Sequence, residues 1–337
     1  MRQPFLFLYT SLPMNTTKKL FNSAKTALPK AGKTIWWLLK IILPVSLVVS
    51  FLQYWGIIAQ IATFLSPVFS IIGLPGESAV IFISSIFLPL YGPIAIISTL
   101  SLDIREITIL AIMCLISHNM IVETAVQKKT GSSAISIFLV RVTTSFAAAY
   151  ILNAILPVHL GSSHAVQKDI FFDNIPAMLS NWIVNAGWLS LKITLIITGL
   201  MILQNILKEF NVLNFLSRDF SPLMRVMGLS DDSSFLWFVA QTLGLTYGSA
   251  VMIEAVEHNE ITKTSANLLN YHIAINHSLL EDTLLFVAIG VPAGWIIAPR
   301  FAFAITFVWS IRVIKSYRLS KIIKQNIQEK LYITRKK

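Results

Sequence analysis

Two segments of this chain place imidazole, amide and carboxylate side chains in the same order within stretches that are otherwise apolar. These groups can hydrogen-bond a polar solute, and an imidazole can exchange a proton near neutral pH. Ionisable groups inside a membrane are costly, so they usually face a protein interior or a water-filled cavity. The two segments therefore predict one polar site that both halves of the chain build. The residues are His118, Asn119 and Glu123 in the first half and Asn276, His277 and Glu281 in the second.

The spacing within each segment predicts which side chains point together. On a continuous helix, the residue four positions before each glutamate shares its face, and this residue is Asn119 in the first half and His277 in the second. The residue after the glutamate is Thr124 in the first half and Asp282 in the second, so the second half carries an additional carboxylate. We expect both sets to line a solute path. The alternative is a proton relay through His277, Glu281 and Asp282.

Four basic residues in or beside the apolar segments need partners. An arginine stays protonated at any accessible pH, so we expect Arg141 and Arg300 to pair with the two glutamates. Such pairs either lock helices together or bias two states of a transporter. Lys40 and Lys192 are further candidates, although a lysine near a helix end can extend to the membrane interface.

The composition indicates an integral membrane protein. Of the 337 residues, 55% are hydrophobic and 13% are charged, and the mean hydropathy is +0.70. Soluble domains carry about 25% charged residues. The net charge of +11 does not indicate nucleic-acid binding, because the basic residues lie outside the apolar segments, as they do at the cytoplasmic face of membrane proteins.

The apolar segments predict an all-α fold with six membrane crossings and two re-entrant helical hairpins. A crossing needs about twenty apolar residues. The hairpin segments, 78–100 and 233–253, are interrupted in the middle, and an arm of about ten residues reaches about 15 Å, half of a ~30 Å membrane core. The segments long enough to cross are 34–55, 107–126, 133–158, 187–208, 264–290 and 293–314.

The predicted hairpin breaks are a second place where a solute could bind. Helix ends exposed at a break leave amides and carbonyls without partners. Gln241 and Thr242, just before the second break, could hydrogen-bond a polar ligand. The alternative for each glycine alone is a bend that helix packing requires. The break residues are Pro89, Gly92 and Pro93 in the first hairpin and Gly244 and Gly248 in the second.

Matching residue pairs recur in order along both halves, which indicates an internal duplication. Each half contains three predicted crossings, and this odd number places the halves in opposite orientations. Lysines and arginines cluster before residue 34, after the second and fourth crossings and at the C-terminus, so both termini are expected to be cytoplasmic. The matching pairs include Ser66-Pro67 with Ser221-Pro222, Gly73-Leu74 with Gly228-Leu229, and Tyr91-Gly92 with Tyr247-Gly248.

The predicted organisation is two inverted repeats with basic flanks. The C-terminal tail keeps apolar residues among its lysines, so it is either an amphipathic helix on the inner leaflet or a solvated, frayed end. The predicted boundaries are a cytoplasmic N-terminal segment at 1–33, a first repeat at 34–158, a periplasmic linker at 159–186, a second repeat at 187–315 and a cytoplasmic tail at 316–337.

Several classes of chemistry lack the residues that they need. The single cysteine, Cys114, excludes an intrachain disulfide and a cysteine-based metal cluster, and we expect no metal site and no cofactor. The chain contains neither a Gly-x-Ser-x-Gly elbow nor a His-Glu-x-x-His zinc motif, so an enzyme is not expected.

The quoted motifs resemble the nucleoside recognition, or Gate, domain family. The first copy is the run 73–78 leading into the broken hairpin, followed by Ser117-His118-Asn119 and Glu123, and the run 276–283 is similar to a second copy. The likeness covers about residues 34–315 and is closest to a fused pair of spore maturation protein A and B domains. More distant members are the gates of ferrous-iron permease B and domains of concentrative nucleoside transporters. The hairpin cysteines of iron gates and a GTPase P-loop are missing here.

The resemblance implies a multi-pass bacterial inner-membrane protein that transports a small polar solute such as a nucleoside. We expect alternating access between the inverted repeats, driven by a coupling ion or a proton. A non-transporting scaffold or accessory gate subunit is the alternative. The expected partners are membrane lipid, the solute and the coupling ion, and a homo-oligomer is compatible with this class.

Overall fold

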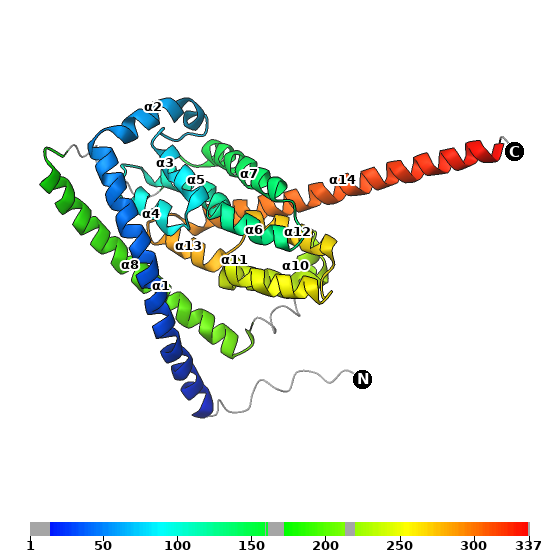
Figure 1. The fold of residues 1–337 in the computed structure, drawn as a ribbon, viewed down its shortest axis with the longest axis horizontal. Helices are drawn as coiled ribbons and strands as arrows, with labels where there is room; N and C mark the ends of the chain where they lie inside the picture. The colour runs from blue at the N-terminus through cyan, green and yellow to red at the C-terminus, as the bar shows by residue number, and fades with distance from the viewer. Residues whose placement is uncertain (1–13, 159, 161–171, 213–219, 336–337) are drawn as a thin grey trace.

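The computed structural model describes residues 14–158, 160, 172–212 and 220–335, which form helices and loops without a strand (Figure 1). A short 3-10 turn, Asp231–Ser233, precedes α11. The helices are α1 (Met14–Tyr54), α2 (Ile57–Ser70), α3 (Ser78–Phe87), α4 (Tyr91–Ile97), α5 (Ile104–Ser117), α6 (Met120–Lys129), α7 (Ala134–Ile155), α8 (Ile175–Glu209), α10 (Ser221–Val226), α11 (Ser234–Glu257), α12 (Lys263–Ile275), α13 (Leu279–Val287) and α14 (Ala293–Arg335).

The described residues contain five helical stretches that are long and apolar enough to cross a membrane. The single crossing expected at 264–290 is instead divided into α12 and α13. The 13 residues of α12 extend only about 20 Å, less than a ~30 Å membrane core. The five stretches are Lys18–Tyr54, Ile104–Lys129, Ala134–Ile155, Ile175–Glu209 and Ala293–Gln325.

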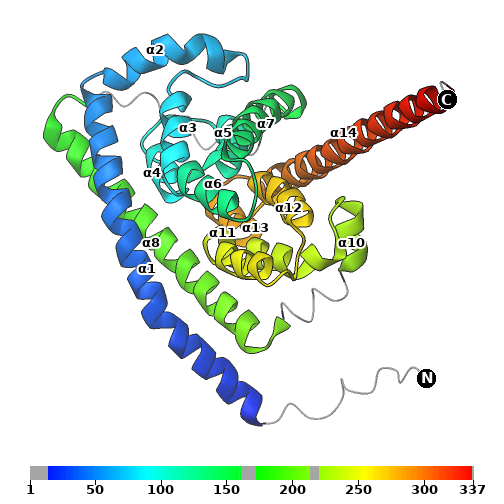
Figure 2. The same ribbon diagram turned by 45° about the vertical axis from the view of Figure 1, so that its right-hand side comes forward.

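Three helices extend beyond the apolar segments that predicted them. α1 begins at Met14, α8 begins at Ile175, and α14 continues as a helix to Arg335, away from the body of the molecule (Figures 1 and 2). Hydropathy marks only the lipid-facing part of a helix, whereas the lysine- and leucine-containing flanks of α1 and α14 also favour helical backbone. Residues 159 and 161–171 of the predicted linker lie outside the described residues.

The α5–α6 stretch lies at the centre of the molecule. In its most apolar window 72% of the residues are buried, against 28% for α1 and α8 and 22% for α14. The outer helices expose large apolar side chains such as Trp37, Leu195 and Val313, which suits contact with lipid tails. The centre is therefore where polar side chains are shielded from lipid.

Helices α1 and α8 pack side by side along one edge of the molecule (Figures 1 and 2). The Trp182 indole donates a hydrogen bond to the Ser46 hydroxyl at 3.0 Å, and the Asn205 amide donates to the Ser23 carbonyl at 2.7 Å. Because the later residue of α1 pairs with the earlier residue of α8, the two helices run antiparallel.

The α5–α6 and α12–α13 stretches also run antiparallel. The Gln127 amide at the end of α6 donates to the Asn270 carbonyl in α12 at 2.9 Å. At the opposite end, a Cβ built on Gly290 would lie 3.0 Å from Cδ1 of Ile104, the first residue of α5. The two stretches therefore lie side by side in opposite directions.

Each half contains a sharp break inside a short apolar helical segment. Leu88 between α3 and α4 is extended, with φ −115° and ψ 153°, and Gly244 within α11 has φ 77° and ψ 168°. A Cβ on Gly248 would lie 3.3 Å from Cα of Ala240, although eight residues of straight helix span about 12 Å. The two arms of α11 therefore fold back on each other, and Gly248 permits their close approach.

Only two of the five predicted break residues stand at a break. Pro89 follows the extended Leu88, and Gly244 is the turning point of α11. Gly92 and Pro93 instead lie in the first turn of α4, where a proline is tolerated because its missing N–H has no helical partner. Gly248 lies within the second arm of α11.

The matched pairs Gly73-Leu74 and Gly228-Leu229 adopt the same helix-ending conformation. The two glycines have φ of 72° and 74°. The N–H of Leu74 donates to Phe69 O at 3.0 Å, and the N–H of Leu229 donates to Met224 O at 2.8 Å. Glycine favours this left-handed cap because it has no Cβ.

Replacing Gly76 by alanine tests the packing of α2 against the start of α3. A Cβ at Gly76 would lie 2.0 Å from the Ala62 carbonyl oxygen and 2.9 Å from its Cα, so backbone must move. We expect Gly76→Ala to lower the free energy of unfolding in detergent by about 1–3 kcal/mol. The matched control is Gly199→Ala, where nothing lies within 4 Å of the added Cβ. Equal stability of the two variants would contradict this packing.

Candidate functional site

Both polar segments interrupt their helices. α5 ends at Ser117 and α6 begins at Met120, with Asn119 between them in the left-handed conformation at φ 49°. In the second half, Ser278 precedes α13 with φ 47°. The expectation that Asn119 shares a continuous helix face with Glu123 is therefore wrong. Hydropathy averages over a break of two or three residues, so it did not reveal these interruptions.

The backbone groups freed at each break bond to the broken helix of the same half. The Asn119 N–H donates to the carbonyls of Ser85 at 2.8 Å and Leu88 at 3.0 Å, where α3 ends. The Ser278 N–H donates to the Ala240 carbonyl at 3.0 Å, just before the turn at Gly244. Each unsatisfied backbone group in hydrocarbon costs several kcal/mol, so each break depends on the other.

Two fully buried arginines bind the carbonyls at the ends of α5 and α12. Arg141 donates from Nε to Ile116 O at 2.6 Å and from Nη2 to His118 O at 2.7 Å. Its Nη1 lies 2.8 Å from Oε2 of Glu123, so the predicted ion pair is present. Arg300 donates from Nη2 to the carbonyl of His277. These arginines therefore bind the carbonyls at the helix breaks, and Arg141 also pairs with a carboxylate.

The arginine contacts fix the register between the halves. In both halves the arginine follows the histidine whose carbonyl it binds by 23 residues, and 159 residues separate His118 from His277. The structural counterpart of Glu123 is therefore Asp282, and the match of Glu123 with Glu281 is one residue out of register.

Glu281 has a different partner from the one expected. Its Oε1 accepts a hydrogen bond from the Tyr91 hydroxyl at 2.5 Å. Within the described part of the chain no ion pair joins Glu281 to Arg300, so that prediction is wrong. Tyr91, which we had noted only as half of a matched pair, thus links the first broken helix to α13.

His118 and His277 meet at the centre of this cluster. Their Nε2 atoms lie 3.3 Å apart. Oε1 of Glu123 lies 3.5 Å from Nε2 of His118 and 3.4 Å from Nε2 of His277, and Oδ2 of Asp282 lies 3.8 Å from Nε2 of His118. All four side chains are buried. The predicted convergence of the two polar segments is therefore present.

Both halves keep buried polar atoms without a hydrogen-bond partner among the described residues, Ser117 Oγ and Thr124 Oγ1 being examples in the first half. Both side-chain atoms of Asn276, Oε1 of Gln241, and Nε and Nη1 of Arg300 are in this group. The Gln241 amide donates to the Asn276 carbonyl at 2.6 Å, which places the two side chains together. Such unpaired groups are rare in folded proteins, and they can bind a polar ligand.

Three predicted residues lie apart from the cluster. Lys40 is exposed and lies over the Trp36 ring at 5.0 Å, and Lys192 is exposed on α8. The Thr242 hydroxyl donates within its own helix to Phe238 O at 2.7 Å. The half-buried Asn119 contributes its backbone conformation, and its side chain makes no capping bond.

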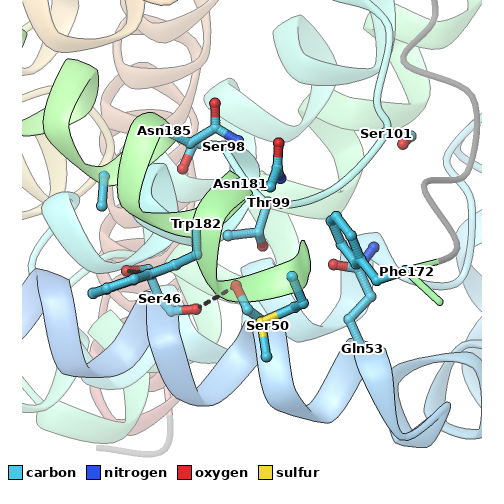
Figure 3. Close-up of a pocket in the computed structure, with 12 residues that line it drawn as sticks. Ser46, Ser50, Gln53, Ser98, Thr99, Ser101, Phe172, Asn181, Trp182 and Asn185 are labelled. Carbon is cyan, nitrogen blue, oxygen red and sulfur yellow. Dashed lines mark hydrogen bonds between the residues drawn. The ribbon is translucent and has the colours of Figure 1, made fainter. Parts of the chain in front are cut away.

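A second polar space, which the sequence did not predict, lies between α1, α8 and the end of α4 (Figure 3). It encloses about 30 Å³, enough for roughly one or two waters. Its hydroxyl and amide groups are neutral, so charge patterning could not reveal it. Its polar lining includes Ser46, Ser50, Gln53, Ser98, Thr99, Asn181 and Asn185.

Replacing Arg141 tests its dual role. Arg141→Met leaves Glu123 and two carbonyls without their donor, so we expect unfolding in detergent to become easier by about 3–5 kcal/mol. Adding Glu123→Gln should restore part of this loss. The control is Arg225→Ala, because the exposed Arg225–Asp231 pair at 2.8 Å should contribute nothing measurable. Equal effects of Arg141→Met and the control would contradict the assignment.

Comparisons with known proteins agree with the motifs. The family model described as "Nucleoside recognition", or Gate, matches residues 35–161. A relative from Bacillus subtilis (strain 168), the "Uncharacterized membrane protein YvoD", is 32% identical over 299 residues, covering 87% of this chain and 94% of that protein. No solved structure matches the chain. The chain belongs to the Gate, or nucleoside recognition, family of membrane proteins, as its motifs predicted.

Proposed function

We propose that this protein is a multi-pass transporter for a small polar solute, a nucleoside being the first candidate. The observation that carries the proposal is the buried cluster where two broken helices meet, with Asn276 and Gln241 holding unpaired polar atoms. Interrupted helices meeting at mid-depth are the usual way in which transporters build a solute site. The family's description supports the choice of a nucleoside.

The second part of the proposal is that the two halves are inverted repeats and that α3–α4 and α11 are re-entrant hairpins. The antiparallel course of α1 with α8 supports it. So do the matching left-handed caps at Gly73 and Gly228 and the matching arginine contacts. The boundaries 34–158 and 187–315 are retained as the repeats.

In the proposed mechanism the repeats rock against each other around the polar cluster. Tyr91 with Glu281 and Glu123 with His277 are single side-chain contacts between the halves. The bonds of Arg141 to backbone lie within one half. Rocking would exchange these contacts and others between the halves, such as the Gln127–Asn270 and Ser46–Trp182 hydrogen bonds, while the broken backbone stays satisfied within each half. Such rigid-body motion around a central site is alternating access, and an ion or proton would drive it.

The solute requires a more open state than the one described. The side chains of the cluster, Asn276 and Gln241 included, are buried, whereas pockets for drug-sized ligands enclose roughly 300–1,000 Å³. A nucleoside would therefore bind where the repeats separate, with its base and sugar hydroxyls replacing the missing partners of Asn276 and Gln241.

The proposed setting is the bacterial inner membrane, with both termini in the cytoplasm. Lys128, Lys129 and Lys263 lie at one end of the bundle, while the opposite end carries Arg105 with Asp103. This asymmetry follows the positive-inside rule. The proposed partners remain lipid, the solute and a coupling ion, and no catalytic role is proposed.

The alternative is a non-transporting scaffold or accessory gate. The contacts of Arg141 within the first half, two hydrogen bonds to carbonyls and an ion pair with Glu123, favour it, because such contacts can lock helices together. A transporter would exchange hydrogen-bond partners in the second half when it binds a solute, whereas a scaffold would keep the same partners.

Cysteine labelling tests the inverted arrangement. Cys114 is fully buried, and Cys114→Ala gives a clean background. We expect an impermeant maleimide to label Val158→Cys and Asp173→Cys in intact cells. Lys129→Cys and Glu260→Cys, also at exposed positions, should react only after permeabilisation. Labelling of Lys129→Cys and Asp173→Cys from one side would contradict the topology.

Uptake into proteoliposomes tests transport. We expect labelled nucleosides to accumulate, and Asn276→Leu to reduce uptake about tenfold or more, because a buried hydrogen bond contributes ~1–3 kcal/mol when its partner would be stranded. The control is Thr143→Val, whose exposed hydroxyl bonds only within α7. No accumulation across a nucleoside panel in folded protein would leave the scaffold as the better candidate.

A further inference from the structure

The two central imidazoles face each other through the ring atoms that carry lone pairs. Nδ1 of His118 lies 3.1 Å from Cys114 O, and Nδ1 of His277 lies 2.7 Å from Ile273 O. A carbonyl oxygen only accepts, so each Nδ1 carries the hydrogen and each neutral ring presents Nε2 as an acceptor. These two Nε2 atoms are the ones 3.3 Å apart.

Two carboxylates point into the same space. Oε1 of Glu123 lies 3.4 and 3.5 Å from the two Nε2 atoms. The ligand atoms of His118, His277 and Asp282 all lie within 4.8 Å of one another. Asp282 is 5% exposed and its Oδ2 has no hydrogen-bond partner among the described residues. Each carboxylate thus lies beside an imidazole acceptor, with no donor between them among the described residues, an arrangement that a positive ion would stabilise.

We propose that this space binds one divalent transition-metal ion of the zinc class, held by Nε2 of His118, Nε2 of His277 and the carboxylates of Glu123 and Asp282. In tetrahedral coordination, bonds of about 2.0–2.1 Å place neighbouring ligand atoms about 3.3–3.4 Å apart. The separations among His118, His277 and Glu123 are 3.3, 3.4 and 3.5 Å. They form one face of such a tetrahedron, and Asp282, at 3.8 Å from His118, is the looser fourth ligand.

The surroundings orient these ligands as in known metal sites. A metal-binding histidine usually donates its other ring N–H to a carbonyl or carboxylate, and both histidines do so here. Arg141 holds the second oxygen of Glu123 at 2.8 Å, which turns Oε1 towards the imidazoles. These carbonyls belong to the last turns of α5 and α12, so the ends of these helices position the ligands.

A proton can bind fewer of these acceptor atoms than a metal ion can. A proton on one imidazole joins two of the four acceptors and leaves Oδ2 of Asp282 without a donor. The local charge also accommodates a cation, since the segments that build the cluster carry three carboxylates (Glu123, Glu281 and Asp282) and two guanidiniums (Arg141 and Arg300). Imidazole and carboxylate together suit zinc, cobalt and iron rather than the alkaline-earth ions.

The ion would join the two halves of the chain. His118 and Glu123 come from the first half, and His277 and Asp282 come from the second. The site does not rest on the proposed transport function, because an ion can bind at equilibrium to a protein that carries no solute. A failure to transport nucleosides therefore leaves the metal site standing, and the reverse also holds.

Cobalt titration of the full chain in detergent tests the site. The protein is purified with a histidine-free affinity tag, stripped with a chelator and titrated with Co²⁺ near neutral pH. We expect one Co²⁺ per chain, with the intense visible absorption of tetrahedral Co²⁺, and displacement by Zn²⁺. An absence of binding in folded protein would overturn the proposal and leave a proton between the imidazoles.

Substitutions locate the bound ion. His277→Gln and Asp282→Asn each remove a ligand while keeping a similar shape, and we expect each to weaken Co²⁺ binding by more than the ~10–100-fold typical of losing an outer-shell partner. Asp282→Asn is the variant less disruptive to folding. The control is His258→Ala, at an exposed histidine, which should change nothing. Unchanged affinity in both ligand variants would show an adventitious ion only and overturn the proposal.

Discussion

The centre of this molecule is arranged around two helix breaks inside the membrane. The backbone groups exposed at each break need hydrogen-bond partners, and these partners determine which side chains lie there. Lipid offers no hydrogen bonds, so every interrupted turn needs a donor or acceptor from elsewhere in the chain. Arg141 and Arg300 supply donors for carbonyls at the ends of α5 and α12. The broken helix beside each of them supplies the acceptor for Asn119 or Ser278. The buried charges and the interrupted helices are thus one device, present in each half.

The residue types were predictable from the sequence, but their register was not. Exposing polar residues to lipid costs free energy, so those in apolar segments must converge inside the protein. This cost predicted the meeting of His118, Glu123 and His277 and the pairing of Glu123 with Arg141. The breaks did not follow, because an apolar window reads the same across a two-residue interruption. Because the breaks were not predicted, Glu123 was matched with Glu281 instead of Asp282, and the contact between Glu281 and Tyr91 was missed. The neutral lining near Ser46 carries no charge signal at all.

The two halves use the same device with different completeness. Arg141 bonds two carbonyls and one carboxylate, whereas Arg300 bonds one carbonyl and keeps Nε and Nη1 without hydrogen-bond partners among the described residues. Asn276 and Gln241 lie in that same half. A satisfied network holds one geometry, while a partly satisfied one can exchange its own contacts for those of a ligand. We therefore propose that a ligand exchanges contacts with Arg300 and Asn276 rather than with Arg141.

Stability alone does not account for this centre. A buried ion pair is often no more stabilising than well-packed apolar side chains of similar volume, because both charges must be desolvated. Two continuous apolar helices would fill the space of α5–α6 and α12–α13 with every backbone group satisfied internally. The chain instead interrupts both helices, buries two guanidiniums to repair them, and directs four acceptor atoms at one point between the halves. A cation or a polar solute at the centre would supply the partners that these acceptor atoms lack, which is why we propose that the function resides there.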